Sequence, residues 1–501
     1  MKRIDAVLQE NAQNQEAVFV FPSEVAASAW ADRFLQISGA GAVAMERFKA
    51  WDTFKGDSVR AREQDKTSIP PALRKLFALN LLYENAALCR AGDPPVFRSL
   101  VNPQYAHSAS SFAPWIASLL PPLALYVERR RTPAGDEDRD LFALAAHYRE
   151  FLAENNLFEP AWEKPPLDTG GKQVFIFYPE LLEDFIDYET LLASAPSVTI
   201  VRSPRADTRP ECRVFPNSRA ELRAAAMHIR RLVDEGLDWQ EIALSVPDGD
   251  TYGPYLQREL ELYGIPVVNH IGKTLAAYPA GAFFPDIQRC EAEEFSWTAL
   301  CRLLLNRHLP WKDAGAIRQL IDFGRRSICV NHTAWTDAFA GPAGAVEQRA
   351  AGFYTQIREH LTALVRAKSF GGMQRAYFAF RERFFIPPAD SETDLILSRC
   401  VSELTELVNL ENAWPRVRCP SPFAFFCRHL REKIYGPAQP RAGVGLFPFR
   451  LAAAAPFGCH IVVGASQKGI TVIFSRLYFL GERLRASLGM ADRAGAADVI
   501  A

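Results

Sequence analysis

The sequence predicts an α/β protein with two cores of alternating strands and helices, each interrupted by a large helical insertion. The first observation is a strand, helix, strand, helix, strand pattern over residues 212–278, with its turn residues in place. The second is that strand-like segments return after each of two long helical stretches. Since strands joined by helical crossovers run parallel, both cores are expected to contain parallel sheets.

At the N-terminus an apolar strand is expected to lead directly into a helix. Ala17–Phe21 is the strand, Pro22-Ser23-Glu24 forms a tight loop, and Val25–Leu35 is the helix. This order of elements is that of a phosphate-binding loop, which also needs glycines for close backbone approach and a lysine for the β- and γ-phosphates. The loop has neither, and it offers a carboxylate where an anion would lie. We therefore expect the architecture of a nucleotide site without its chemistry.

Two long helical stretches separate the strand-like segments. Residues 70–155 carry apolar side chains at three- and four-residue spacing, and the predicted strand Val174–Phe177 follows them. Residues 291–440 form the second stretch, after which His460–Val463 and Thr471–Phe474 have the composition of strands. The layout is an α/β core with a helical insertion, found twice.

The unit from residue 212 starts with a predicted strand, Cys212–Phe215, and a helix. Ser218 and Glu221 have the spacing of a capping box, which would satisfy the first free amides of that helix. Apolar residues then recur at helical spacing, and Gly236 is placed to end the helix.

The second half of this unit repeats the pattern. A short buried strand is expected at Ile242–Val246, Gly264 is well placed to end the helix that follows, and Ile265–Val268 begins the next strand. The tripeptide Gly272-Lys273-Thr274 matches the end of a phosphate-binding loop, but the glycine required five positions earlier is Val267. We therefore predict a turn at 272–274.

The composition is that of a neutral globular protein. In 501 residues the formal net charge is −1, which excludes a globally basic nucleic-acid binder but allows a local basic groove. The nine cysteines include no C-x-x-C pair, so reduced thiols are expected. No apolar segment of an export signal follows Lys2 and Arg3, and the longest apolar runs, 112–127 and 446–465, contain prolines or charged residues. A cytoplasmic protein without a membrane partner is expected.

Candidate catalytic groups are few. Glu180, Glu183 and Asp184 follow a strand, where active nucleotide-driven motors place carboxylates that bind magnesium and polarise water. Without a phosphate-binding lysine, we prefer the interpretation that they start a helix, whose dipole favours acidic residues. The histidines show no metal-ligand spacing and there is no G-x-S-x-G motif. No catalytic, cofactor-binding or metal-binding residue is assigned.

Several short motifs point to one family. They are the run from Phe19 to Glu24, Glu46-Arg47-Phe48, the run from Trp51 to Lys55, the run from Tyr178 to Asp184, the unit from Cys212 with Gly264-Ile265-Pro266, and Phe479-Leu480 with Arg483, Leu488 and Gly489. With them the chain resembles AddB-type subunits, the helicase-like, nuclease-bearing partners in bacterial AddAB helicase-nucleases and members of the PD-(D/E)XK nuclease family.

The resemblance implies two superfamily 1 helicase-like (RecA-like) cores. The first core would comprise residues 1–65 and 166–205, with residues 66–165 as its helical insertion. The second core would comprise residues 206–290 and 441–501, with residues 291–440 as its insertion. The resemblance also implies a task, the processing of double-strand DNA ends for recombinational repair.

The partners implied by the resemblance are single-stranded or forked DNA and an ATP-dependent AddA-like helicase-nuclease subunit. AddB-like proteins continue into a nuclease domain, so an iron-sulfur cluster and magnesium are expected only if such a domain lies beyond residue 501; the chain is expected to be truncated before it. The leading hypothesis is an ATPase-inactive, DNA-binding scaffold subunit. The alternatives are an interaction scaffold without DNA binding and a nuclease subunit whose catalytic domain lies beyond residue 501.

Candidate DNA contacts combine positive charge with aromatic platforms on which bases stack. They are Arg47, Trp51, Lys55, Arg129, Arg130, Arg131, Arg325 and Arg326. Alternatives stay open, because a tryptophan such as Trp51 is more often a core residue and a run such as 129–131 is more often a solvated turn.

Overall fold

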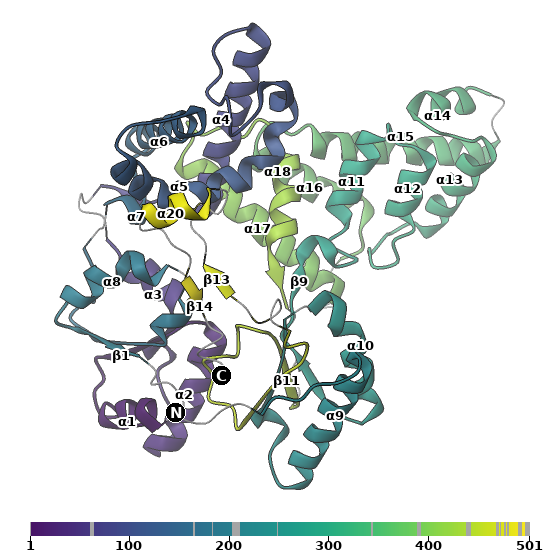
Figure 1. Cartoon of the computed structure of the whole chain (residues 1–501). Helices are drawn as coiled ribbons and strands as arrows, with labels where there is room; N and C mark the ends of the chain where they lie inside the picture. Colours follow the sequence, from purple (N-terminus) through teal and green to yellow (C-terminus); the bar gives the residue numbers. More distant parts are fainter. Residues whose placement is uncertain are drawn as a thin grey trace.

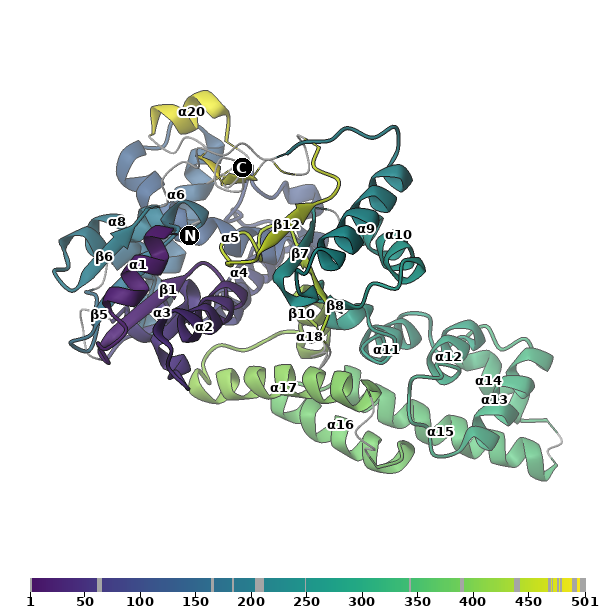
Figure 2. The same cartoon turned by 90° about the horizontal axis from the view of Figure 1, so that it is seen from below.

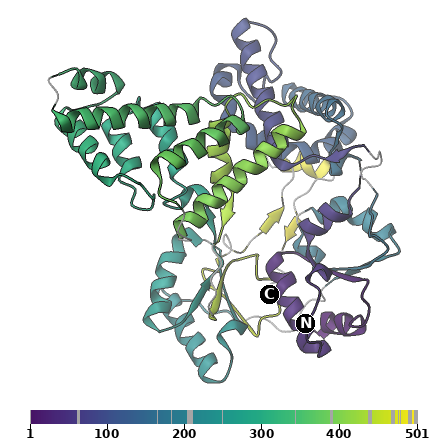
Figure 3. The ribbon, with the colours of Figure 1, turned by 180° about the vertical axis from the view of Figure 1, so that it is seen from behind.

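The computed structural model describes residues 2–495, except for 61–64, 164–165, 183, 203–210, 248, 342–343, 388–391, 437–441, 467–469, 471, 475–476, 478–479 and 489–492. It is a mixed α/β protein with two four-stranded parallel sheets. Figure 3 shows the two α/β units side by side, with the helical regions packed along one side of them. The predicted Glu183 and the residues 496–501 lie outside the described part of the chain.

The first α/β unit is built on a parallel sheet with the strand order β2-β1-β5-β6. Its strands are β1 (Ala17–Phe21), β2 (Phe48–Ala50), β5 (Gln173–Phe177) and β6 (Val198–Val201). The predicted strands at Ala17–Phe21 and Val174–Phe177 are confirmed, and they are direct neighbours in the sheet although about 150 residues separate them.

Helices cover both faces of this sheet. The side chains of Phe19, Phe21 and Phe177 face α1 (Lys2–Glu10) and α2 (Glu24–Ser38). The alternating residues Val18, Val20 and Ile176 face α3 (Trp51–Ser58) and α8 (Phe185–Ser194) on the other side. Strand alternation therefore divides the core into two apolar layers, as expected for a sheet buried on both faces.

Helical region 1 is inserted between β2 and β5. Its elements are α4 (Pro71–Ala91), η2 (Pro103–Phe112), α5 (Ala113–Arg130), α6 (Asp136–Glu154) and α7 (Pro160–Glu163). The short strands β3 (Thr67–Ser68) and β4 (Leu157–Phe158) pair in parallel where the chain enters and leaves the region.

One stretch of helical region 1 has the length and composition of a membrane-spanning helix. Among the described residues this holds for Pro103–Arg130 alone. Its side chains Ile116, Leu120 and Tyr126 are buried in the helical core, and Trp162 Nε1 donates a hydrogen bond to Leu120 O. The prolines that interrupt the apolar run at 112–127 do not end the helix, because Pro121 and Pro122 lie inside α5.

The second α/β unit has the strand order β12-β7-β11-β8. Its strands are β7 (Ile242–Val246), β8 (Val267–Asn269), β11 (Val444–Pro448) and β12 (Cys459–Val462), and all pairs are parallel. One face packs on α9 (Ser218–Asp234) and α10 (Gly249–Leu262). Ala243 and Phe447 point from the opposite face toward Val25 of α2, so the first unit closes that face.

The predicted strand Cys212–Phe215 is wrong. This segment has no regular secondary structure, and Val214 is 99% exposed. Both positions beside β7 are taken, by β12 on one side and β11 on the other, and the segment pairs with no described strand.

The predicted capping box is wrong. Asn217, not Ser218, caps α9, since its side chain accepts a hydrogen bond from Ala220 N over 2.9 Å. Glu221 instead accepts a hydrogen bond from Gly464 N over 2.7 Å. The helix start is thereby tied to the loop after β12.

The predicted turn at Gly272-Lys273-Thr274 is a short strand. β9 (Lys273–Thr274) pairs antiparallel with β10 (Ile434–Tyr435), and the two strands form the link to helical region 2. A Cβ on Gly272 would lie 2.9 Å from Tyr435 O, so the close approach of the two strands requires glycine here. Gly264 does lie in the left-handed region at the end of its helix, as expected.

Helical region 2 contains the elements between β9 and β10. They are η5 (Leu275–Ala277), α11 (Phe283–Ala292), α12 (Trp297–Leu304), α13 (Ala314–Arg326), α14 (His332–Phe339), α15 (Ala345–Val365), α16 (Phe370–Phe384), α17 (Glu392–Ala413) and α18 (Pro422–Glu432). Helical structure thus starts before residue 291. Figure 2 shows α12 to α15 leading away from the α/β units.

The last described segment does not join the second sheet. β13 (Val472–Phe474) pairs antiparallel with β14 (Arg493–Gly495) as a separate ribbon, so the predicted strand is present, but outside the parallel core. Between them, α20 (Glu482–Ser487) lies beside α5 and α7 of helical region 1 (Figure 1), with Leu480 and Leu488 buried in the helical core.

Candidate nucleotide site at the edge of the first sheet

The carboxyl ends of β1 and β5 form the position where a nucleotide would bind in a parallel α/β sheet. The chain leaves β1 toward β2 on one side and returns through β5 on the other, so the strand order reverses between β1 and β5. Ligands of open α/β sheets bind in the crevice at such a switch point. Two short connections face it, Pro22-Ser23 after β1 and Tyr178 after β5.

The connection between β1 and α2 cannot cradle a phosphate. Only two residues separate strand and helix, and Ser23 caps α2 by accepting a hydrogen bond from Ala26 N over 3.1 Å. Glu24 places a carboxylate in the first helical turn, where it accepts a hydrogen bond from Thr53 Oγ1 over 2.9 Å. A phosphate-binding loop instead leaves several backbone N–H groups free for the anion.

A loop of the second unit covers this position. The covering loop (residues 449–457) joins β11 to β12, and Ser23 Oγ donates a hydrogen bond to Leu451 O over 2.9 Å. The indole Nε1 of Trp30, on α2, donates to Ala454 O over 2.6 Å, and this bond is buried. Side chain to backbone bonds of one helix therefore hold a segment more than 400 residues away in sequence.

Apolar contacts complete the closure. Ala454 is buried in the same core as Phe21 and Trp30, while Ala452 packs with Val25. Phe449 packs against Leu181, which follows β5 in the 3-10 helix η3 (Pro179–Leu181). The crevice between the ends of β1 and β5 is thus lined by protein atoms of the second unit.

Tyr178 marks the end of β5. Its backbone lies in the left-handed region with φ 54°, which is uncommon for a residue other than glycine. Burial raises the pKa of its phenol to about 12, and the carboxylates of Glu180 and Asp5 add to the effect. The hydroxyl stays protonated at neutral pH.

Trp51 and Lys55, two of the predicted DNA contacts, meet at Asp184. Trp51 is buried and donates a hydrogen bond from Nε1 to Asp184 Oδ1 over 2.7 Å. Lys55 forms ion pairs with Asp184 and, over 2.8 Å, with Asp52. Burial alone would lower the pKa of Lys55, but these carboxylates raise it. This ion-paired cluster joins α3 to the start of α8 and leaves the lysine no free phosphate-binding role.

Arg47 lies at the opposite side of the first unit and is 7% exposed. It ends the 3-10 helix η1 (Met45–Arg47). Its guanidinium donates hydrogen bonds to Ala17 O over 3.1 Å, Asn14 O over 2.9 Å and Asn11 O over 3.1 Å. Arg47 therefore holds the turn before β1, with its charge inside the fold.

The other predicted contacts are placed on two distant helices. Arg129 donates to Leu488 O, which joins α5 to the end of α20, and Arg130 pairs with Asp138 over 2.8 Å within helical region 1. Arg131 is exposed at the end of α5. Arg325 and Arg326 are exposed at the end of α13, where Arg325 lies 3.6 Å from Asp322. The structure does not bring these groups into one surface.

The described part of the chain offers no candidate metal site and no activated thiol. In the part of the chain that the structure describes, no three His, Cys, Asp or Glu side chains converge as metal ligands. The cysteines are free thiols, and burial raises the pKa of Cys290 and Cys400 to about 12.

The sequence analysis missed the covering loop and Trp30. Ala452 to Ala455 are small residues followed by proline, a pattern that indicates close packing but not what it packs against. The strand β11 escaped notice because it overlaps the start of the apolar run at 446–465 and shows no alternation of apolar and polar residues.

Comparisons with known proteins agree with this architecture. Residues 4–202 match a family model described as the Treponema TP0900 N-terminal P-loop domain, and residues 276–436 match the Treponema TP0900 fourth helical domain. A protein of Treponema pallidum (strain Nichols), named only as an uncharacterized protein, is 31% identical over 555 aligned positions, covering 98% of this chain and 69% of that protein. The first α/β unit is accordingly a P-loop domain, and helical region 2 coincides with the second match.

Proposed function

This chain belongs to the Treponema TP0900 family, and we propose that it is a helicase-like scaffold subunit that holds DNA and a partner protein without hydrolysing a nucleotide. The observation that carries the proposal is the closed nucleotide site of its P-loop domain. Ser23 and Trp30 bind the covering loop where a nucleotide would enter. The connection Pro22-Ser23 directly after β1 contains no lysine or glycine.

The finer identity, an AddB-type subunit with two RecA-like cores, is part of the proposal. It is supported by a second parallel sheet with helices on one face, by a helical region inserted in each unit, and by the pairing of the two units around the first sheet's carboxyl edge. Ligands of open α/β sheets bind at the carboxyl edge. Here the covering loop of the second unit occupies that edge of the first sheet, which fits a subunit that relies on an AddA-like partner for ATP hydrolysis.

The first test is nucleotide hydrolysis. The purified chain with Mg²⁺, ATP and single-stranded or forked DNA is expected to release no phosphate above background, because the chemistry of the phosphate-binding loop is missing. Phosphate release measured with and without DNA decides this. DNA-stimulated hydrolysis that falls when Ser23 is replaced by alanine would contradict the proposal.

The second test is DNA binding and its salt dependence. Arg325 and Arg326 keep their guanidinium groups exposed, so the double Arg→Ala variant is expected to bind single-stranded DNA more weakly and to lower the slope of log K against log salt by about 1 to 2. Mobility shifts over a salt series measure the slope. Arg139→Ala is the matched control, an exposed arginine paired with Asp136 on α6. If neither single-stranded nor forked DNA shifts at low salt, the alternative of an interaction scaffold without DNA binding is favoured.

A further inference from the structure

The two helical regions meet around a cavity of about 440 Å³. Helical region 1 contributes Pro70, Pro71 and Lys75 from the start of α4, and helical region 2 contributes side chains of α17 and α18. This volume lies in the range of small-molecule sites, which are mainly apolar with a few convergent polar groups. The cavity is distant in the fold from the covering loop and serves no part of the closed nucleotide site.

The walls of the cavity are apolar and partly flat. Leu407 and Leu410 are buried beside it, and the indole of Trp414 and the rings of Pro70 and Pro71 face it. A ligand body that stacks on rings and displaces water from leucine side chains fits such walls.

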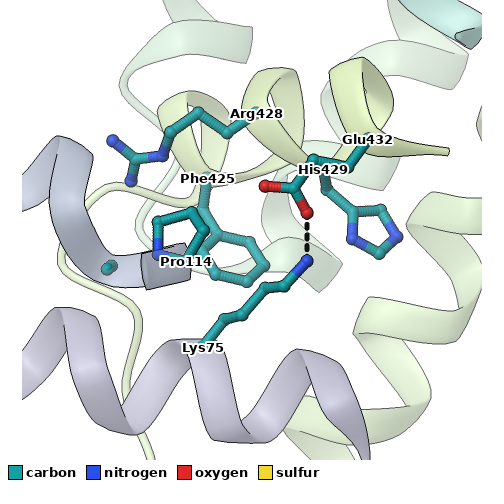
Figure 4. A pocket seen from close by; sticks show the side chains of 7 residues that line it. Lys75, Pro114, Phe425, Arg428, His429 and Glu432 are labelled. Carbon is teal, nitrogen blue, oxygen red and sulfur yellow. Dashed lines mark hydrogen bonds and ion pairs between the residues drawn. The ribbon is translucent and has the colours of Figure 1, made fainter. Parts of the chain in front are cut away.

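Positive charge gathers at one side of the cavity. Lys75 and His429 line both this cavity and the adjoining hollow, which Arg428 also lines; Figure 4 shows Lys75 reaching Glu432 below Phe425. Lys433 also lines the cavity and shares the carboxylate of Glu403 with a further arginine.

The charges around the two hollows do not cancel. The charged side chains that line them are the cations Lys75, Arg428 and Lys433 and the carboxylates Glu406 and Glu432. These three cations and two carboxylates leave one positive charge in excess. Glu406 is exposed, so water screens its charge, while Lys75 and Lys433 are only partly exposed.

We propose that this cavity binds a small amphipathic anion, a molecule with a flat apolar body and one carboxylate, sulfonate or phosphate group. The body lies against Trp414, Leu407 and Leu410, and the anionic group faces Lys75. Because α4 belongs to one helical region and α17 and α18 to the other, the bound molecule links the two regions.

Two fluorescent probes test the proposal on the full chain: 1-anilinonaphthalene-8-sulfonate, and N-phenyl-1-naphthylamine, which has the same apolar body without the anion. Lys75→Met is expected to weaken binding of the sulfonate probe roughly 5- to 10-fold and to leave the neutral probe within about 2-fold. Glu432→Gln, which frees Lys75 from its ion pair, is expected to tighten the sulfonate probe several-fold. A purely structural role for this ion pair would not make the two variants act in opposite directions.

Two further variants locate the site. Ala413 is exposed at the rim, so Ala413→Trp fills the mouth without disturbing the core and should abolish binding of both probes. Lys368→Met is the matched control, since Lys368 is an exposed lysine outside the cavity. Sulfonate binding that survives Ala413→Trp overturns the cavity assignment. Equal responses of the two probes to Lys75→Met and Glu432→Gln overturn the anion preference.

Discussion

Replacing Trp30 by alanine is expected to lower the free energy of unfolding by about 3–5 kcal/mol, because the change removes a large aromatic side chain from a closed core. Trp30 is fully buried, and its ring stacks on Phe21 with the ring centroids 5.8 Å apart. Its indole also donates the hydrogen bond that holds Ala454. Urea unfolding followed by circular dichroism measures the loss.

Trp30→Phe separates the hydrogen bond from the packing. Phenylalanine keeps an aromatic ring against Phe21 but leaves Ala454 O without its donor, which costs about 1–3 kcal/mol when the carbonyl stays buried. Hydrogen exchange of the backbone amides at 451–457 is expected to accelerate, because the covering loop loses its buried anchor.

Trp162→Phe is the matched control for this exchange experiment. Trp162 also donates its indole hydrogen to a backbone carbonyl, Leu120 O, over 2.8 Å, but both residues belong to helical region 1. Exchange at 451–457 should stay unchanged in this variant. Equal acceleration in both variants, or none in Trp30→Phe, would show that Trp30 does not hold the covering loop.

The same variant separates the two reasons why the site is expected to be inactive. One reason is steric, since the covering loop fills the crevice; the other is chemical, since the loop after β1 has no glycine and no lysine. If loosening the loop by Trp30→Phe leaves ATP unbound, the missing phosphate-binding groups suffice to explain inactivity. ATP binding that appears in the variant would assign the block to the loop.

Local sequence signals predicted two of the four strands of the first sheet, β1 and β5, but not β2 and β6. The strand Ala17–Phe21 is a compact apolar run, and the tight loop after it leads directly into the helix. Each of these features depends on neighbours in the sequence, so the pattern alone indicates it. The same holds for the strand at Ile242–Val246 and for Gly264 at the end of α10.

The sequence pattern does not show which distant segments pair with each other as strands. Cys212–Phe215 has the composition of a strand, but it pairs with no described strand, and β12 and β11 are the neighbours of β7. Composition reports a preference for extended backbone and not whether a partner edge is vacant. β11 is a strand that the pattern did not indicate, because a strand buried on both faces shows no alternation of apolar and polar residues.

The sequence predicts which phosphate-binding residues the candidate site lacks, but not which residues cover the site. The missing glycine and lysine are visible in Pro22-Ser23-Glu24. The bonds from Ser23 and Trp30 to the covering loop join residues more than 400 positions apart, and small alanines carry no mark of their partner. Arg47 was predicted as a DNA contact because of its charge. Its guanidinium instead lies inside the fold, where it donates hydrogen bonds to three backbone carbonyls.

The base of helical region 2 is held by one fully buried carboxylate, Glu403 of α17. Arg399 Nη2 lies 2.6 Å from Oε1, while His429 Nε2 and Lys433 Nζ lie 2.9 Å and 3.0 Å from Oε2. Lys433 precedes β10, and its carbonyl accepts a hydrogen bond from Leu275 N. Glu403 therefore ties α17 and α18 to the link with the second α/β unit.

Glu403→Gln is expected to destabilise the protein by about 3 kcal/mol at neutral pH, because a buried charged network loses its central carboxylate. Burial alone would raise the pKa of Glu403, but the hydrogen bonds from His429 and Lys433 outweigh it and lower the pKa to about 2, from an ordinary 4.5. A depressed folded-state pKa means that the stabilisation is complete above about pH 4.5 and is lost as the pH falls toward 2.

The pH dependence distinguishes this charge effect from a change in packing. The difference in unfolding free energy between the wild type and Glu403→Gln should be largest near neutral pH and should shrink between pH 4.5 and pH 2, as measured by urea unfolding across that range. Glu406→Gln on the same helix is the control, since its exposed carboxylate should change stability by less than about 0.5 kcal/mol. A wild-type advantage that stays constant down to pH 2 would mean that the glutamine disturbs packing. Ionisation of Glu403 would then not be what fastens helical region 2 to the link at β9 and β10.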